Sequence, residues 1–128
     1  MAILLKIRWQ IKRDLEREFH QNQERLCTVM SGDHPGVICY HVDYPEPLVS
    51  EWTEIYSNDA VFKAHLDNPK GHGPLGKLIE ACDRIACRCW GDPSADSRRL
   101  LAAFKPSFHE TAAGSFFLHP RADRASSI

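Results

Sequence analysis

The residues of this chain whose types and spacing could do chemistry lie mainly between positions 50 and 78. Trp52, Glu54 and Tyr56 occupy alternate positions, so a β-strand would place all three side chains on one face. His65 follows in a pattern that predicts a short helix, where it lies beside an apolar stripe. Histidine can act as an acid or a base near neutral pH. The sequence therefore predicts a histidine placed over a strand that carries two aromatic residues and a carboxylate.

Each of these residues also has a purely structural interpretation. A histidine beside an apolar helical stripe is more often hydrogen-bonded to a backbone carbonyl than catalytic. Trp52 and Tyr56 could belong to the core or to a subunit interface, because buried aromatic residues contribute much packing energy. Glu54 needs a partner if its face of the strand is buried, and Arg8 or Arg88 across the sheet would serve.

Other candidate motifs carry weaker signals. His41 and Asp43 lie two apart on one predicted strand and could form an acid–base pair, although such residues are usually solvated. Residues 71–76 read GHGPLG, which lacks the Lys-Ser/Thr ending of a phosphate loop, and we expect a sharp elbow there that could gate a cavity. The five cysteines do not have the spacing of zinc ligands, so we expect reduced thiols and no metal site.

Length and composition indicate one ordinary globular domain. The 128 residues can bury a substantial core, and 43% of them are hydrophobic and 26% charged. A formal net charge of -1 gives no reason to expect binding to nucleic acid or to an anionic membrane. No apolar run approaches the roughly 20 residues of a membrane span, and the N-terminal apolar stretch is too short for a signal peptide. We therefore expect a cytoplasmic protein.

The order of the predicted elements indicates an α+β, ferredoxin-like fold. Alternating residues predict strands at 3–9, 37–44, 50–56 and 84–90. Helical spacing predicts helices at 11–30, from the candidate caps at 57–59 to the stop at Asn68-Pro69, and at 74–82. This β-α-β-β-α-α-β order is the split βαβ arrangement, a four-stranded antiparallel sheet with its helices on one face. We assign residues 1–92 to this domain. Residues 93–128 form a C-terminal extension with a helix at 94–105, then a loop from residue 107 or a short strand at 115–118, and a frayed tail.

The second face of such a sheet also needs a partner. Whichever set of alternate residues faces the helices, the other set still offers aliphatic, cysteine or aromatic side chains on several strands. Apolar surface of this kind favours association, and a homodimer that packs sheet against sheet is the simplest solution.

The run from Glu54 to Leu66, EIYSNDAVFKAHL, resembles the segment E-x-Y-x-(D/E)-x-x-A/V-F-x-x-H-L of the antibiotic biosynthesis monooxygenase family. That resemblance implies a dimeric α/β-barrel domain over about residues 1–92. Enzymes of this family oxygenate polycyclic phenols without a cofactor in a cavity between sheet and helices, and a related branch degrades haem. His65 falls on the family's His-Leu position. His72 lies near a second histidine of the family, although GHGPLG replaces the usual Pro-His-aromatic run.

The reaction that the resemblance implies asks for a base, an aromatic wall and a group that holds an anion. A base removes a phenolic proton, an apolar pocket holds the anion, and molecular oxygen accepts an electron from it. The catalytic candidates are His65 as the base, with Tyr56 and Trp52 as hydrogen-bond donor and aromatic wall. The candidates for binding the substrate are Arg8, His41, Glu54, Phe62, His72 and Arg88.

Three functional hypotheses follow. The first is a cofactor-independent monooxygenase that acts on a small aromatic or quinol-like compound. The second is a non-catalytic dimeric module that binds a small apolar ligand. The third, a haem-binding or haem-degrading relative, is less favoured, because the haem degraders of this family have a helical tryptophan where this chain has His65. We expect the extension at 93–128 to wrap the partner subunit or to cover the mouth of the cavity.

Overall fold

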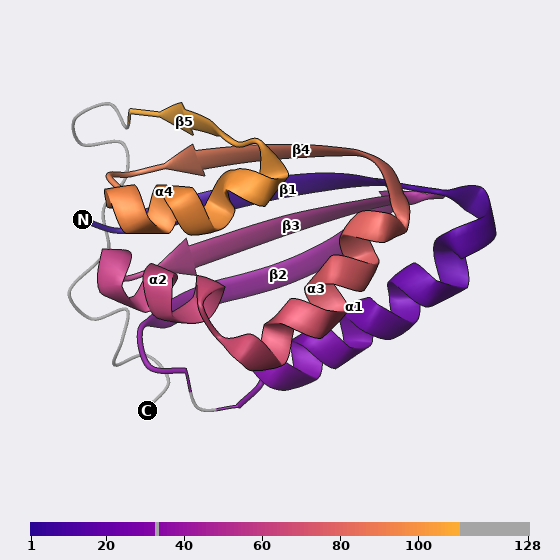
Figure 1. The fold of residues 1–128 in the computed structure, drawn as a ribbon, viewed down its shortest axis with the longest axis horizontal. Coiled ribbons are helices and arrows are strands. Elements are labelled where there is room, and N and C mark those ends of the chain that lie inside the picture. The colour runs from indigo at the N-terminus through magenta and orange to yellow at the C-terminus, as the bar shows by residue number, and fades with distance from the viewer. Residues whose placement is uncertain (33, 111–128) are drawn as a thin grey trace.

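The computed structural model describes residues 1–32 and 34–110 and shows one sheet with all its helices on one face (Figure 1). The strands are β1 (Ile3–Ile11), β2 (Val37–Glu46), β3 (Val49–Tyr56), β4 (Cys82–Trp90) and β5 (Ser107–His109). The helices are α1 (Glu16–Met30), α2 (Asp59–Leu66), α3 (Pro69–Glu80) and α4 (Ala95–Leu101), with short 3-10 turns η1 (Arg13–Leu15) and η2 (Ala102–Phe104). None of the described helices is long and apolar enough to cross a membrane.

The sheet has the strand order β2-β3-β1-β4-β5. Its first four strands pair antiparallel in the split βαβ topology, so the predicted fold class is confirmed. The fifth strand was not predicted: Ser107 to His109 pair parallel to β4, where the sequence suggested a loop. The predicted strand at 115–118 lies outside the described residues.

Two predicted helices begin at other residues. The helix predicted from residue 11 begins later, because β1 continues to Ile11, and α1 proper starts at Glu16. The elbow predicted at 71–76 is wrong, because α3 runs through it from Pro69. Proline suits the first turn of a helix, and the Asn68 side chain accepts a hydrogen bond from the Lys70 backbone N–H at 3.1 Å.

One glycine within α3, Gly71, also has a packing role. A side chain at Gly71 would come within 3.3 Å of Leu26 on α1, so glycine lets the two helices lie close together. Figure 1 shows α1 and α3 side by side across one end of the sheet. The predicted helix at 94–105 is divided between α4 and η2 and ends at Lys105 in a left-handed conformation.

The core lies between the helices and one face of β1. Five alternate residues of β1 are buried there: Ile3, Leu5, Ile7, Trp9 and Ile11. The Trp9 ring contacts three aromatic rings from other elements, with centroid distances of 5.7 Å to Phe19, 4.9 Å to Trp52 and 5.7 Å to Phe104. Trp9 therefore joins α1, β3 and η2 into one aromatic cluster.

The second face of the sheet is more charged than the sequence suggested. Apolar side chains occur there at Leu4, Ile55 and Trp90, but β1 and β4 also present an exposed row of cations: Lys6, Arg8, Arg84 and Arg88. The expectation of an apolar second face is therefore wrong for the half of the sheet that β1 and β4 form. Burial of the odd-numbered residues of β1 forces its lysine and arginine outward.

Candidate functional site

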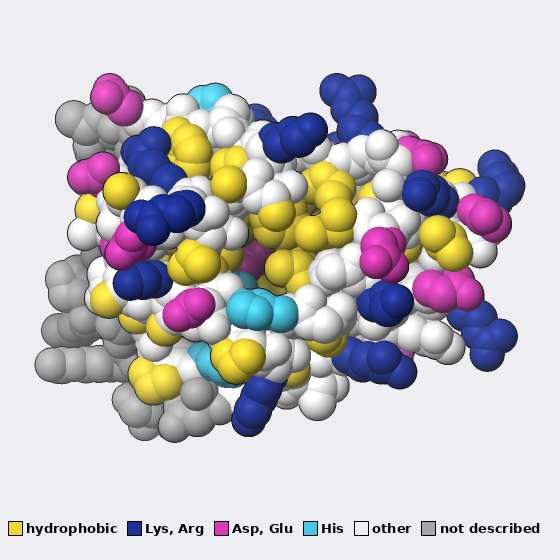
Figure 2. All heavy atoms as spheres, in the orientation of Figure 1, with side chains coloured by type: hydrophobic (Ala, Val, Ile, Leu, Met, Phe, Trp, Pro, Cys, Tyr) yellow, Lys and Arg dark blue, Asp and Glu magenta, His cyan; other side chains and the backbone are white. Residues whose placement is uncertain are grey.

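A cavity with a volume of about 40 Å³ lies between the sheet and the helices. Figure 2 shows hydrophobic side chains around a hollow on the helix-covered face, with histidine beside it. The sheet lines the cavity with five residues: Leu5 and Ile7 of β1, Tyr40 of β2, and Trp52 and Glu54 of β3. Helix α1 adds Leu26, Val29 and Met30, α2 adds His65 and Leu66, and α3 adds Gly71, His72 and Leu75. The rest of the lining is Asn68 from the link between α2 and α3, Leu101 of α4 and Phe104 of η2. Glu54 is the one acidic residue of this lining.

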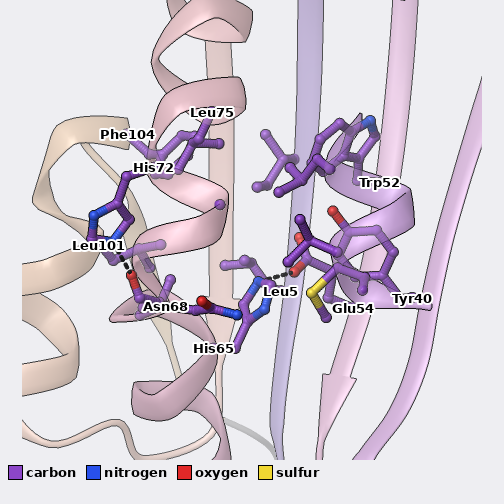
Figure 3. Close-up of a pocket in the computed structure, with 16 residues that line it drawn as sticks. Leu5, Tyr40, Trp52, Glu54, His65, Asn68, His72, Leu75, Leu101 and Phe104 are labelled. Carbon is purple, nitrogen blue, oxygen red and sulfur yellow. Dashed lines mark hydrogen bonds and ion pairs between the residues drawn. The ribbon is translucent and has the colours of Figure 1, made fainter. Parts of the chain in front are cut away.

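Glu54 and His65 form the polar centre of the cavity (Figure 3). The Glu54 side chain is only 3% exposed, and its Oε1 lies 3.3 Å from Nε2 of His65, whose side chain is 14% exposed. The Tyr56 hydroxyl donates a second hydrogen bond to the same carboxylate oxygen. A buried carboxylate is costly unless it is paired and hydrogen-bonded, and these two partners meet that need.

The second ring nitrogen of His65 remains free. Nδ1 is buried, and no described residue offers it a hydrogen bond. If Nε2–H donates to Glu54, the neutral imidazole presents Nδ1 as a proton acceptor. When Nδ1 takes up a proton from another molecule, the Glu54 carboxylate stabilises the resulting imidazolium. The pair thus has the arrangement of an oriented general base.

The local sequence explains how these side chains meet. The alternation of β3 turns Glu54 toward the helices, directly opposite Leu5 on β1 and Tyr40 on β2. Asn58 caps α2, because its side chain accepts a hydrogen bond from the Val61 backbone N–H at 3.0 Å. His65 then lies in the last turn of α2, above the strand that carries Glu54.

Tyr40 and Trp52 form an aromatic wall beside this pair. Their ring centroids are 5.9 Å apart, and the Tyr40 ring lies 6.0 Å from that of His65. Burial, reinforced by the negative charge of Glu54, raises the pKa of Tyr40 far above its ordinary value. Its hydroxyl therefore stays protonated and can donate a hydrogen bond to an anion in the cavity. The Trp52 indole N–H donates to Ser50 Oγ at 2.8 Å, so Trp52 offers the cavity its ring.

Tyr56 and Phe62 lie deeper than the cavity lining. Both are fully buried, and their rings pack at a centroid distance of 5.1 Å. Burial first, and then the nearby Glu54, raise the pKa of Tyr56 well above its ordinary value. Tyr56 therefore acts on the site through Glu54, and Phe62 packs against the Tyr56 ring.

His72 lies at the rim and is exposed, with Nε2 3.1 Å from the Leu66 carbonyl oxygen. Figure 3 shows it on α3, apart from the Glu54–His65 pair. Asn68, in the short link between α2 and α3, lines the cavity between the two histidines.

Three of the residues expected to bind substrate face away from the cavity. Arg8, His41 and Arg88 are exposed on the opposite face of the sheet. Arg8 forms an ion pair with Glu51 there, and its Nη2 lies 3.7 Å from Oε1 of Glu46. The expected pairing of Glu54 with an arginine is therefore replaced by pairing with His65.

Sequence reasoning missed Tyr40, Asn68, Leu101 and Phe104 as parts of the site. Tyr40 could have been found, because it alternates with Val42 on a strand next to the one that carries Glu54. Leu101 and Phe104 reach the cavity only through tertiary packing of the C-terminal extension. Among the described residues, no three His, Cys, Asp or Glu side chains come together as metal ligands.

Comparison with known proteins gives the fold its context. No protein-family model matches the chain, and no curated protein matches it. A conserved protein from Methanosarcina mazei Go1 superposes with a TM-score of 0.63 at 18% identity, over 73% of this chain and 94% of its own. A protein from Bacteroides thetaiotaomicron described as a "Putative antibiotic biosynthesis monooxygenase" gives 0.62 at 17% identity, over 67% and 84%.

This is an antibiotic biosynthesis monooxygenase-like fold. MupZ from Pseudomonas fluorescens also has this fold, with a TM-score of 0.60 at 16% identity, and covers 93% of this chain and 95% of its own. Identities this low establish the architecture alone. In this chain, the Glu54–His65 pair lies in the cavity between the sheet and the helices of that fold.

Proposed function

We propose that this protein is a cofactor-independent monooxygenase that acts on a small aromatic or quinol-like compound. The observation that carries the proposal is the buried Glu54–His65 pair in a cavity whose other walls are almost entirely apolar. An apolar site strengthens a single charge interaction and binds flat aromatic molecules. The names of several structures with the same fold support the reaction class.

The reaction begins with the transfer of a phenolic proton to His65. Glu54 orients the imidazole and stabilises its charged form, and the Tyr40 hydroxyl donates a hydrogen bond to the phenolate. The phenolate passes one electron to molecular oxygen, and the resulting radical pair combines into a peroxide on a ring carbon. Loss of water from the peroxide, with a proton returned from His65, leaves the quinone. One phenol and one O₂ thus give one quinone and one water.

Oxygen consumption tests this proposal directly. We expect turnover of one-ring hydroquinones by the wild type, and a loss of roughly 10²- to 10⁴-fold in kcat/KM for His65→Gln, the range that general bases contribute. His72→Gln is the matched control, because His72 lies at the rim and contacts a backbone carbonyl. No oxygen uptake above the buffer rate, or equal loss in both variants, would overturn the proposal.

A non-catalytic module that binds a small apolar ligand is the second candidate. The cavity has a volume of about 40 Å³, whereas sites for drug-sized ligands, catalytic or not, are commonly about 300 to 1,000 Å³, so under either function the ligand must be small. Phenol binding without oxygen uptake would select this function. A volume of this size gives no support to haem binding.

We also propose a homodimer formed through the outer face of the sheet. This face combines the apolar Leu4, Ile55 and Trp90 with charges of both signs. The cations lie on β1 and β4, and the acids Asp43, Glu46 and Glu51 lie on β2 and β3. Such a surface is complementary to a second copy of itself.

A further inference from the structure

The C-terminal extension contributes part of the cavity wall. Leu101, at the end of α4, is 0% exposed, and Phe104, in η2, is 6% exposed; both line the cavity. We call these two residues the C-terminal wall. The Phe104 ring stands edge-on to Trp9, with a centroid distance of 5.7 Å and an interplanar angle of 85°. The wall therefore closes the cavity from a segment outside the four-stranded domain at 1–92.

This wall is attached to the helix that carries His65. The Asp59 carboxylate, at the start of α2, accepts a hydrogen bond from the Ser94 backbone N–H at 2.9 Å. Farther along the two helices, Lys63 and Asp96 pair at 3.4 Å. Since α4 is fixed to α2 at two points, the position of the wall relative to His65 is fixed as well. Figure 1 shows α4 beside α2 on the helix-covered face.

The likeness to MupZ extends into the same segment. It covers 93% of this chain, which is more than residues 1–92 amount to. An extension of this kind thus belongs to at least one other protein with the same fold.

We propose that Leu101 and Phe104 set the size limit of the ligand and restrict the site to one-ring phenols and quinols. The ligand class rests on the proposed function, whereas the size limit rests on the packing. Phe104 lines the same cavity as Trp52 and His65, so a second fused ring of a bound ligand would compete with the Phe104 side chain for space. Because the volume of the cavity is only about 40 Å³, a ligand with a second fused ring must displace part of the cavity wall.

Binding of four ligands to two matched variants tests the size limit. The ligands are benzene, naphthalene, phenol and 2-naphthol, and binding is measured by quenching of tryptophan fluorescence. In Phe104→Ala we expect the affinity for naphthalene relative to benzene to rise at least about tenfold, because the phenyl ring no longer fills the cavity. The control is Phe19→Ala, because Phe19 packs against Trp9 at the same centroid distance of 5.7 Å and does not line the cavity.

Each outcome decides the inference. A ratio that stays unchanged in a folded Phe104→Ala protein, or that rises equally in Phe19→Ala, overturns it. Should Phe104→Ala fail to fold, Phe104→Leu retains an apolar side chain and must change the ratio in the same direction by a smaller factor.

The hydroxyl groups of the ligands separate this inference from the proposed function. Preference for phenol over benzene, and its loss in His65→Gln, reports the base and its partners. Neither naphthalene nor benzene has a hydroxyl group, so the ratio of their affinities reports the C-terminal wall alone. A wall effect without any preference for phenol would leave the size limit standing and remove the monooxygenase proposal.

Discussion

Glu54 is the residue on which the polar centre of this protein depends. It sits between two aromatic residues on a buried strand face, and it stays there because His65 and Tyr56 both bind its carboxylate. Residue alternation alone places Trp52, Glu54 and Tyr56 on one face. The identity of the partner of Glu54 could not be read from that pattern, because it depends on how α2 crosses β3.

The orientation of the arginines could have been derived from the sequence. The odd-numbered residues of β1, from Ile3 to Ile11, are the strongly apolar set, so Lys6 and Arg8 must face the other side of that strand. The pairing of Leu5 with Glu54 then excludes Arg8 from the cavity. What the sequence lacks is the register between strands, which aligns these patterns.

Tyr56 gives a prediction in pH dependence. Below pH 10 this tyrosine is protonated in both the folded and the unfolded chain. Above pH 10 the unfolded chain loses the proton, whereas burial and the nearby Glu54 raise the pKa of Tyr56 in the folded protein and keep it bound. The free energy of unfolding therefore falls as the pH rises, by up to about 1.4 kcal/mol per pH unit for this group.

Urea unfolding of the wild type and Tyr56→Phe, measured from pH 8 to pH 11, checks this. We expect the variant to lose about 1 to 3 kcal/mol at pH 8, because the Glu54 carboxylate loses a donor, and to show a shallower decline above pH 10. The raised pKa values of Tyr40 and the buried cysteines affect both proteins equally. Parallel pH curves for the two proteins would contradict the prediction.

At the scale of elements, local signals explain most of the helices and strands but not their extent. The Asn68-Pro69 pair contained both a cap and a proline suited to the first turn of α3, yet the glycines and proline of residues 71–76 suggested a break. Close packing on α1 favours glycine at position 71, whereas a Cβ atom at Gly73 or Gly76 would meet nothing within 4 Å. β5 has only three residues and pairs with a strand distant in sequence, so no local pattern marks it.

The attachment of α4 to α2 gives a second pH-dependent prediction. Burial raises the pKa of Asp59, but hydrogen bonds from Ser94 and Ser97, together with the charge of Lys63, outweigh it and lower the pKa below the ordinary 3.8. A lowered pKa in the folded protein means that the stabilisation is present above about pH 4 and is lost as the pH falls through the folded-state value.

We expect Asp59→Ala to lower the free energy of unfolding by about 1 kcal/mol at pH 7, and the difference from the wild type to shrink toward pH 2. Asp59→Asn is the matched control. It retains an oxygen that accepts from Ser94 but carries no charge, so its deficit is smaller at pH 7. Thermal unfolding at a series of pH values measures both. A deficit in Asp59→Ala that is constant with pH would show that the charge plays no part.

At the scale of the whole molecule, the outer sheet face is divided by charge. Lys6 and Arg88 lie directly opposite each other on β1 and β4, and like charges in that position repel. Asp43 and Glu51 lie opposite each other on β2 and β3, on the other half of the face. Charge of the opposite sign, placed over each half of the face, would therefore offset the repulsion within that half.

A second copy can supply that charge in one orientation. A two-fold axis parallel to the strands places β1 and β4 of one subunit over β2 and β3 of its partner, whereas an axis across the strands would place like charges together. We therefore expect a dimer that weakens as salt is added, because partly exposed charge pairs are screened. Arg88→Glu should raise the dimer dissociation constant about tenfold or more.

Sedimentation velocity at 50 mM and 500 mM salt measures this dimer. Lys70→Glu is the control, because Lys70 lies on α3 at the helix-covered face and is exposed. The charge reversal Arg88→Glu combined with Asp43→Lys should restore part of the affinity, since β4 of one subunit lies over β2 of its partner in this orientation. A monomer at all concentrations would overturn the dimer proposal and leave the function of the cavity to a single subunit. A dimer that responds equally to Lys70→Glu would show that the subunits meet at another surface.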